Sequence, residues 1–500
     1  MPLFSSELKY AETHFKFKLP WSFLYKKWPE IFADAPRIVL PGKKLPLWLV
    51  AKDSHLFNVT VLRVDYLLEK DNVILDQGSW ELNQFLDKPF HFEELPFDEV
   101  LPAGEYKLRL NFDVENTKGK RQIFADTNLP KLQGIPIEFK VLRDPYPYPN
   151  QWLAGEHHCH TTYTSDPVEF GAPIEVLQKS AEVLGLDYVN LTDHSYNFAY
   201  DSVEYMTPRP PAEKWNEFLK ETKAAKPKPY MIPGIEVSCG NQHGENVHLL
   251  LHNCEKYTLG LGDSGRRWFN NKPDQTIQEC LDQNPNSPAF AAHPCVKIGK
   301  LEKKIFRRGS WSKQDISQDL NGLQFWNGSR NKGFDDGKKF WVEQLLAGKK
   351  LLPIAGNDAH GDLNRTFGVQ IPLVKLKWSR NHCFGVARTL FPTVDGSLNQ
   401  LVASMKSNKC VCTDGPFLDL TLSSNELKLI ALSTQDFGTW KELILYSGKI
   451  GSKEEVRRNL KVQSNLELEA KIPLQQADYY RLEGKTKSGY FAMTSALFSN

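Results

Sequence analysis

The sequence predicts an α/β domain flanked by an N-terminal and a C-terminal β-sandwich-like domain. Three observations lead to this fold class. Short strand-like runs fill about 35–143, strand and helix patterns alternate over about 150–400, and strand-like alternation returns after 415. The chain has 500 residues, and a single hydrophobic core stops growing at roughly 250–300 residues, so more than one domain is expected.

The first domain is expected to consist of short strands. Four apolar or alternating runs, separated by turn residues, lie at 37–40, 47–50, 59–62 and 106–110. Regularly spaced short strands are typical of a β-sandwich. A proline-dense stretch at 144–150 then marks a domain boundary. We therefore expect the first domain, with this linker, to cover residues 1–148.

The middle of the chain alternates strand and helix patterns. Residues 173–184 have helical spacing, and Gly185 suits the position just after a helix. Buried strands are expected at 187–191, 230–237, 247–251, 289–292, 323–326 and 352–355. Strands that alternate with helices are typical of a parallel α/β domain, which we place at 149–412. The long insertions at about 196–230 and 252–285 are interpreted as lids or binding loops.

Beyond 415–416 the helical pattern ends. Leucine and alanine alternate with polar residues at 418–422, 427–431 and 466–470, which is the spacing of half-buried strands. The sequence therefore predicts a second, smaller β domain over 413–500.

Charge and apolar content exclude several classes of function. The formal net charge is only +2, so no global positive field favours nucleic acid or a membrane surface. The sequence contains no run of about 18 apolar residues, so no transmembrane helix is expected. The N-terminus lacks the apolar core of a signal peptide. The eight cysteines are scattered instead of spaced as a disulfide framework. We expect a cytoplasmic protein with reduced thiols.

Histidines and carboxylates concentrate at the C-terminal ends of the predicted strands in the middle domain. His158 and His160 are two residues apart, so in an extended chain both imidazoles point to one face. Asp358 and His360 repeat that spacing. The other candidates at this edge are His194, Glu236, His248 and His293. Zinc, manganese and iron all accept imidazole and carboxylate ligands, and barrel-type α/β folds place their chemistry at the same edge.

Each pattern alone has a structural explanation, because a lone histidine pair in a strand is more often incidental than a ligand pair. However, six of the thirteen histidines fall at the same edge of one domain, together with three acids, Asp193, Glu236 and Asp358. Core histidines satisfied by hydrogen bonds would not concentrate in this way, so a metal site is the favoured interpretation. His157 should point to the opposite face and is interpreted as structural.

Five motifs resemble those of the PHP family, the polymerase and histidinol phosphatase superfamily. They read EHHCHTTYTSD at 156–166, LTDH at 191–194, GIEVS at 234–238, AHP at 292–294 and GNDAH at 356–360. They occur in the family's order over about half of the chain. The resemblance implies a distorted TIM-like barrel of seven βα units with a trinuclear metal site, and it adds Asp166 to the ligands.

The resemblance also implies how three divalent metal ions (zinc, manganese or iron) would be held. One would be bound by His158, His160, Glu236 and Asp358, a second by Glu236, His248 and His293, and a third by Asp166, His194 and His360. The interval from His160 to Asp166 is one residue longer than the family pattern, and Glu156 replaces the usual aspartate. The flanking β domains and the TDGPFL segment at 413–418 resemble the carbaryl-hydrolase-like branch of the superfamily.

Clustered divalent metals lower the pKa of a bridging water and neutralise charge on a phosphoryl or carbonyl oxygen. We therefore expect a metal-dependent phosphoesterase, in which a metal-activated hydroxide attacks a phosphorylated small molecule. Its catalytic residues would be Glu236, Asp358 and Arg365, with Arg365 clamping phosphate through two hydrogen bonds. Arg330 is a second candidate clamp, and either arginine could instead be an ordinary surface residue. Asp193 is expected to orient a ligand imidazole or to cap a strand end.

Two other functions stay open. The first is a metal-dependent hydrolase of a carbamate, carboxyl ester or amide, and the second is a non-catalytic binding module with a relic barrel. Nucleic acid is indicated only as a nucleotide-type substrate, and no membrane partner is expected. The GxGxxG match at 260–265 lacks a preceding strand and a following helix, so no dinucleotide site is expected there.

Overall fold

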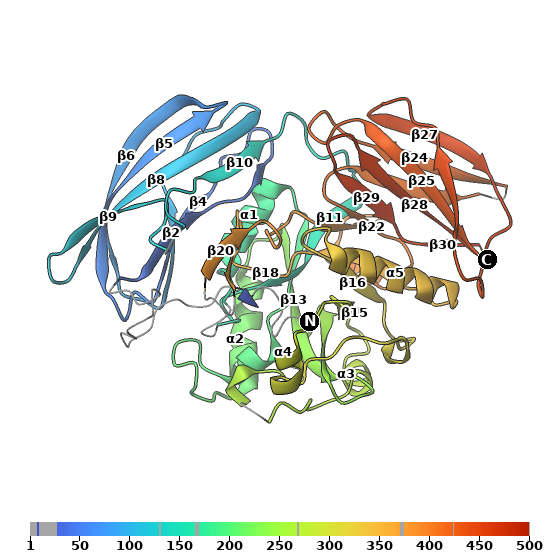
Figure 1. The fold of residues 1–500 in the computed structure, drawn as a ribbon, viewed down its shortest axis with the longest axis horizontal. Helices are drawn as coiled ribbons and strands as arrows, with labels where there is room; N and C mark the ends of the chain where they lie inside the picture. The colour runs from blue at the N-terminus through green and yellow to red at the C-terminus, as the bar shows by residue number, and fades with distance from the viewer. Residues whose placement is uncertain are drawn as a thin grey trace.

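The computed structural model describes residues 8–9, 28–129, 132–165, 170–267, 270–370, 375–423 and 425–499. The N-terminal strands lie at the upper left of Figure 1 and the C-terminal strands at the upper right, with the middle of the chain below and between them. Thirty β-strands and six α-helices occur in the described residues. None of the helices in these ranges is both long and apolar enough to cross a membrane.

The N-terminal strands form two sheets around one core. Their bounds are β2 (Glu30–Asp34), β3 (Ile38–Val39), β4 (Leu47–Lys52), β5 (Val59–Lys70), β6 (Val73–Leu86), β7 (Phe90–Leu95), β8 (Gly104–Asn116), β9 (Arg121–Ala125) and β10 (Ile137–Val141). One sheet has the order β2-β4-β7 and the other β3-β10-β8-β5-β6, with β9 paired to β8. Leu49 of the first sheet and Leu68 and Leu108 of the second are buried in the shared core.

The middle of the chain supplies seven neighbouring strands of one large sheet. They are β11 (Trp152–His160), β12 (Tyr188–Leu191), β13 (Tyr230–Gly240), β14 (Asn246–His252), β15 (Ala289–Ala292), β16 (Gly322–Asn327) and β17 (Leu352–Gly356). The helices between them are α1 (Ile174–Leu184), α2 (Pro211–Ala224), α3 (Ile277–Gln283), α4 (Lys300–Ile305) and α5 (Lys332–Leu346), with short 3-10 turns η1 (Ser195–Ala199), η2 (Gly265–Arg267) and η3 (Lys313–Asp315). Helix α1 ends where the sequence predicts, at Gly185 with φ 70°.

The prediction of an α/β barrel with seven βα units is wrong. In such a barrel each strand is parallel to its neighbours and is followed by a helix. Here β13 and β14 run antiparallel across a short turn, and β14 is also antiparallel to β15. The sheet does not stay within this segment, because beyond β11 it continues through β21 (Arg388–Pro392) into the C-terminal strands and reaches 15 strands. The fold is therefore β-rich with mixed strand directions. Residue periodicity identified the strands but carried no information on their direction.

The C-terminal strands make a second pair of layers. They are β22 (Val411–Thr413), β23 (Phe417–Leu422), β24 (Glu426–Leu432), β25 (Trp440–Gly448), β26 (Val456–Leu460), β27 (Glu467–Pro473), β28 (Tyr479–Thr486), β29 (Phe491–Thr494) and β30 (Leu497–Phe498). The sheet β23-β24-β27 shares a core with β25 and β28 of the large sheet. Since β22 spans 411–413 and pairs with β21, strand pairing continues across the predicted boundary at 412/413.

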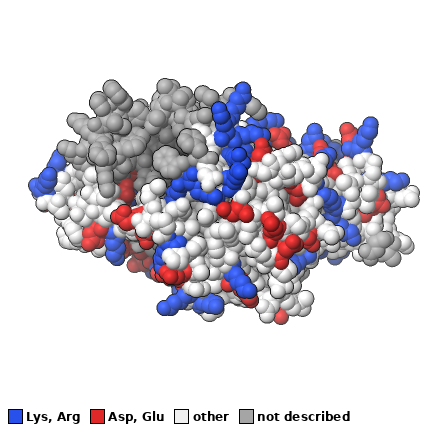
Figure 2. All heavy atoms as spheres, turned by 90° about the horizontal axis from the view of Figure 1, so that it is seen from below, with Lys and Arg blue, Asp and Glu red and all other residues white. Residues whose placement is uncertain are grey.

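The remaining elements join these parts. Strands β1 (Leu8–Lys9), β19 (Thr366–Gln370) and β20 (Lys375–Ser379) form a small antiparallel sheet, β18 (Ala359–His360) pairs with β11, and α6 (Leu398–Met405) follows β21. The linker at 144–150 is packed, since Tyr146 stacks on Phe437 and lies under the Arg388 guanidinium at 4.0 Å. Seen from below, acidic and basic side chains are interspersed over the described part of that face (Figure 2), in keeping with the small net charge.

Candidate metal centre

Eight of the nine predicted ligands meet at one edge of the large sheet. His158 and His160 lie in β11, Glu236 in β13, His248 in β14 and His360 in β18, while His194, His293 and Asp358 directly follow or flank strand ends. Pairing sets their positions, because His160 is in register with His360 and His194 forms a bridge with Glu236. The ninth, Asp166, lies outside the described residues.

The first group is formed by His158, His160, Glu236 and Asp358, all buried. The two imidazole Nε2 atoms are 3.3 Å apart. Glu236 Oε2 lies 3.2 Å from His158 Nε2 and 3.5 Å from His160 Nε2. Asp358 Oδ1 lies 3.5 Å and 3.3 Å from the same two nitrogens. Four possible ligand atoms therefore converge on one point, and they belong to the four residues that the family resemblance assigns to one metal.

Glu236 also connects the first group to the other histidines. Its Oε1 lies 2.6 Å from His248 Nδ1 and 3.1 Å from His293 Nε2. Its Oε2 lies 3.0 Å from His194 Nδ1. A carboxylate whose two oxygens face different sets of imidazoles has the arrangement expected of a bridging ligand.

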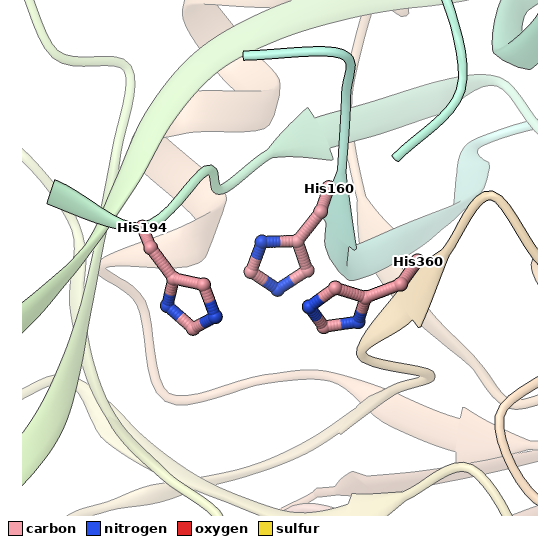
Figure 3. A group of neighbouring side chains, drawn as sticks. All are labelled: His160, His194 and His360. Atoms are coloured by element: carbon pink, nitrogen blue, oxygen red, sulfur yellow. The ribbon is translucent and has the colours of Figure 1, made fainter. Parts of the chain in front are cut away.

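A second group consists of His160, His194 and His360, whose rings converge from three different segments (Figure 3). The His160 ring stacks on that of His360 with centroids 3.9 Å apart, and it lies 4.5 Å from the His194 ring. His160 is therefore shared by two groups, whereas the predicted arrangement assigned it to one.

The hydrogen bonds around the centre test whether these residues fit a metal. The backbone N–H of His293 donates to Gln324 Oε1 at 3.0 Å, so this atom is an acceptor. His158 Nδ1, 3.4 Å from the same oxygen, must then be the donor, so that in its neutral form the ring carries its lone pair on Nε2. His360 Nδ1 likewise donates to the Asp358 carbonyl at 3.0 Å. Lone pairs that face two carboxylates repel one another unless a cation lies among them. These buried groups can hold a metal ion.

Electrostatics within the cluster agree with this interpretation. Burial alone would raise the pKa of Glu236, but the imidazoles of His248, His158 and His194 hold it well below its usual range. Burial and the neighbouring imidazoles of His360 and His194 lower the pKa of His160 well below its usual value. Glu236 is therefore ionised and His160 neutral near pH 7, the protonation states that metal ligation requires of these two residues. Burial acts to lower the pKa of His248, but the carboxylates of Glu236 and Asp263 raise it to about 9, so a metal ion bound there would displace a proton from its ring.

Two of the ligands have a strained backbone. His293 has φ 30° and Asp358 has φ 52°, in the left-handed region that side chains other than glycine seldom adopt. Both residues come at the C-terminal end of a strand, after β15 and β17. Such strain costs about 1–3 kcal/mol and tends to occur at functional sites.

Several residues that the sequence analysis did not single out hold the ligands in place. Gln324 accepts from His158, and its Nε2 donates to Asn327 Oδ1 at 2.9 Å. Asn327 Nδ2 in turn donates to Asp358 Oδ2 at 3.1 Å, so that Oδ1 is the oxygen that faces the histidines. Asn327 stands at a predicted strand end and could have been found there, but Gln324 lies within a strand and carried no signal.

A second set of supports surrounds β11. Thr164 Oγ1 lies 3.1 Å from His160 Nδ1 and accepts from the His194 backbone N–H at 3.2 Å. Asp193 accepts from the backbone N–H groups of Thr161 and Thr164, both at 2.8 Å. Asp193 thus orders the loop that carries Thr164, so its effect on His160 is indirect. Glu156 is buried and accepts from the backbone N–H groups of His158 and Asn357 at 2.9 and 2.8 Å.

His157 points away from the centre, as the sequence predicts. Its Nε2 lies 2.9 Å from the Tyr188 hydroxyl, and its ring contacts Phe290 and His252. Burial lowers the pKa of His157 to about 3, so the ring is neutral.

The structure does not bring the two candidate arginines to the metal centre. Arg365, expected to clamp phosphate, is buried against the N-terminal strands, where Nη1 donates to the Ile135 carbonyl at 2.9 Å. Arg330 Nη2 donates to the Gly489 carbonyl at 2.5 Å and lies 3.2 Å from Asp414 Oδ2 in the C-terminal part. Arg365 therefore links the middle of the chain to the N-terminal part, and Arg330 links it to the C-terminal part.

A different arginine lies beside the centre. Arg308 Nε is 3.2 Å from Asp263 Oδ2, and the same oxygen is 2.8 Å from His248 Nε2. The Arg308 side chain is 38% exposed, whereas that of Asp263 is fully buried. Asp263 falls within the GxGxxG match, whose glycines have a packing role: a Cβ at Gly262 would lie 1.9 Å from Asn246 Oδ1.

Comparisons with known proteins add little to this geometry. No family model matches the chain, and no curated protein matches its sequence. Among solved structures, the chain is similar to a β-D-mannosidase from Dictyoglomus thermophilum, with 9% identity and a TM-score of 0.22 over 94% of this chain and 66% of that one. A second is a Paenibacillus cycloisomaltooligosaccharide glucanotransferase, with 9% identity and a TM-score of 0.16 over 94% and 71%. Scores this low do not show a shared fold.

Proposed function

We propose that the protein is a metal-dependent hydrolase of the PHP type that acts on phosphoesters. The observation that carries the proposal is the convergence of His158, His160, Glu236 and Asp358 on one buried point, with four further histidines around it. The motif order along the chain supports the family resemblance. When bound, divalent metal ions supply a water nucleophile of lowered pKa and positive charge to offset the charge that develops on the substrate.

The chain's own residues account for ligand geometry and substrate charge. Gln324, Asn327 and Thr164 fix the ligand atoms by hydrogen bonds before any metal arrives, which reduces the cost of ordering them. Arg308 places a guanidinium at the edge of the centre, where it can pair with a phosphoryl oxygen. Arg308 is therefore the candidate for the phosphate-pairing role that was expected of Arg365.

The test is hydrolysis by metal-loaded protein of p-nitrophenyl phosphate, bis-p-nitrophenyl phosphate and p-nitrophenyl acetate. Wild type should hydrolyse a phosphate ester, and His158→Ala should lose this activity. His243→Ala is the matched control, because His243 is an exposed histidine outside the centre. Phosphate turnover that survives in His158→Ala, or its absence from metal-loaded wild type, would contradict the proposal.

A carboxyl ester, carbamate or amide hydrolase is the second candidate, favoured by one observation. Neither Arg365 nor Arg330 reaches the centre, so the two-pronged phosphate clamp expected from the sequence is not formed by them. Arg308→Ala separates the two candidates. It should raise KM for phosphate esters and leave KM for the acetate ester unchanged if phosphoesters are the substrates.

A further inference from the structure

Asp263 is joined to the metal centre through one of its histidines. Its Oδ2 lies 2.8 Å from His248 Nε2, while the other ring nitrogen, Nδ1, lies 2.6 Å from Glu236 Oε1. Ser238 Oγ donates to the second oxygen of Asp263. The imidazole of His248 is therefore held by a carboxylate at each nitrogen, and both carboxylates are buried.

The orientation of this ring is opposite to that of two other ligands. His158 and His360 give Nδ1 to an outer acceptor and present Nε2 to the centre. His248 presents Nδ1 to the centre and gives Nε2 to Asp263. An imidazole that binds a metal through one nitrogen carries its proton on the other, so the acceptor at the outer nitrogen selects the ligating atom.

We propose that Asp263 is a positioning residue of the metal centre, which holds the proton on His248 Nε2 and so presents Nδ1 as the ligand atom. The inference rests on the metal-binding part of the proposed function and not on its substrate. Asp263 would share with Gln324 and the Asp358 carbonyl the task of fixing an imidazole from outside the centre.

The surrounding backbone holds Asp263 at this place. Gly260 and Gly262 let its loop approach β13 and β14 closely, since a Cβ at Gly260 would lie 2.6 Å from Val237 Cγ1. The segment that carries Arg308 is tied to Asn246 by two backbone hydrogen bonds, Asn246 N–H to the Arg307 carbonyl at 2.7 Å and Gly309 N–H to the Asn246 carbonyl at 2.8 Å. Arg308 therefore reaches Asp263 from a backbone that is itself fixed.

These contacts allow a purely structural alternative, in which Asp263 serves only to anchor Arg308. The two roles differ in what Asp263→Asn and Arg308→Ala do to metal binding. If Asp263 positions His248, removing its charge weakens the ligand, whereas removing Arg308 leaves the carboxylate on His248 in place. If Asp263 only anchors Arg308, the two variants lose the same interaction and should behave alike.

The experiment is titration of chelator-stripped protein with Zn²⁺ and Co²⁺ by calorimetry. Asp263→Asn should lower the metal affinity of the site that contains His248 by about 10–100-fold, which is the usual effect of removing such a hydrogen-bond partner. Arg308→Ala should keep the metal affinity of wild type. The visible absorption spectrum of Co²⁺-loaded protein should change in Asp263→Asn and remain that of wild type in Arg308→Ala. A loss of folding stability alone would not change this spectrum.

The outcomes separate this inference from the proposed function. Wild-type affinity and an unchanged Co²⁺ spectrum in Asp263→Asn would overturn the inference alone, and so would equal losses in both variants. Failure of wild-type protein to bind either ion would overturn the metal-dependent function together with the inference. Lack of phosphoesterase activity in protein that binds metal would leave the inference intact.

Discussion

His158 Nε2 and His160 Nε2 lie 3.3 Å apart, and each also lies within 3.5 Å of a Glu236 and an Asp358 oxygen. Hydrogen bonding to Gln324 leaves the lone pair of His158 on the nitrogen that faces these oxygens. The arrangement is repulsive without a cation and attractive with one. Metal binding should therefore affect the stability of the whole fold.

The first prediction concerns thermal stability on metal addition. Zn²⁺ or Mn²⁺ added to chelator-stripped protein at about 100 times its Kd should stabilise the fold by about 2.7 kcal/mol, because the ion binds the folded chain only. His160→Ala should lose this response in a melting experiment. His243→Ala should keep it, and equal shifts in both variants would contradict the assigned site.

The second prediction concerns Gln324, which accepts from His158 and from the His293 backbone. Gln324→Met removes this acceptor at similar volume and should lower metal affinity by about 10–100-fold. Gln344→Met is the matched control, since Gln344 is an equally buried amide in α5 that belongs to no ligand contact described above. Calorimetric titration measures both, and an affinity loss in the control would show a general packing effect.

The third prediction concerns Arg365, which is buried beside Asp34 and Asp126. Arg365→Met removes the hydrogen bond to the Ile135 carbonyl and the positive charge that acts on the two carboxylates, and should destabilise the fold by about 1–3 kcal/mol in urea unfolding. Below the unfolding transition, KM for a phosphate ester should match wild type. A raised KM with unchanged stability would restore the phosphate-clamping role expected from the sequence.

The fourth prediction concerns Asp34 and pH. Burial raises its pKa to about 7, although the Leu363 backbone N–H and the Arg365 guanidinium act to lower it. The folded chain thus holds this proton more tightly than the unfolded chain, whose reference value is 3.8. The associated stability is complete below about pH 4 and is lost as pH rises through 7, at about 1.4 kcal/mol per pH unit between these values.

Asp34→Asn cannot titrate and should lack this slope. The difference in unfolding free energy between wild type and variant should therefore shrink by about 2–3 kcal/mol between pH 5 and 8. Asp98→Asn, at a carboxylate whose side chain is 81% exposed, is the control and should run parallel to wild type. A constant difference for Asp34→Asn would show that its carboxyl does not titrate in this range.

Local patterns identified the eight candidate ligands that the structure brings together, whereas Asp166, which only the family resemblance adds, lies outside the described residues. Because side chains alternate along an extended chain, the spacing of His158 and His160 predicts one shared face and sends His157 to the other, where it contacts Tyr188. Helical spacing and Gly185 predicted α1 to its last residue. These features depend on neighbours within a few residues, so the sequence carries them directly.

Tertiary structure alone decided the strand directions, the arginines and the supporting residues. Strand direction depends on pairing between segments, and the antiparallel β13–β14 pair overturned the expected barrel. Arg365 meets Ile135, 230 positions earlier in the chain, and Asp263 meets His248 through a loop with no periodicity. The sequence by itself determined which side chains could bind a metal. Only the tertiary structure determined which charged groups surround these side chains. Those contacts join segments that are far apart in the sequence, and no local sequence pattern links such segments.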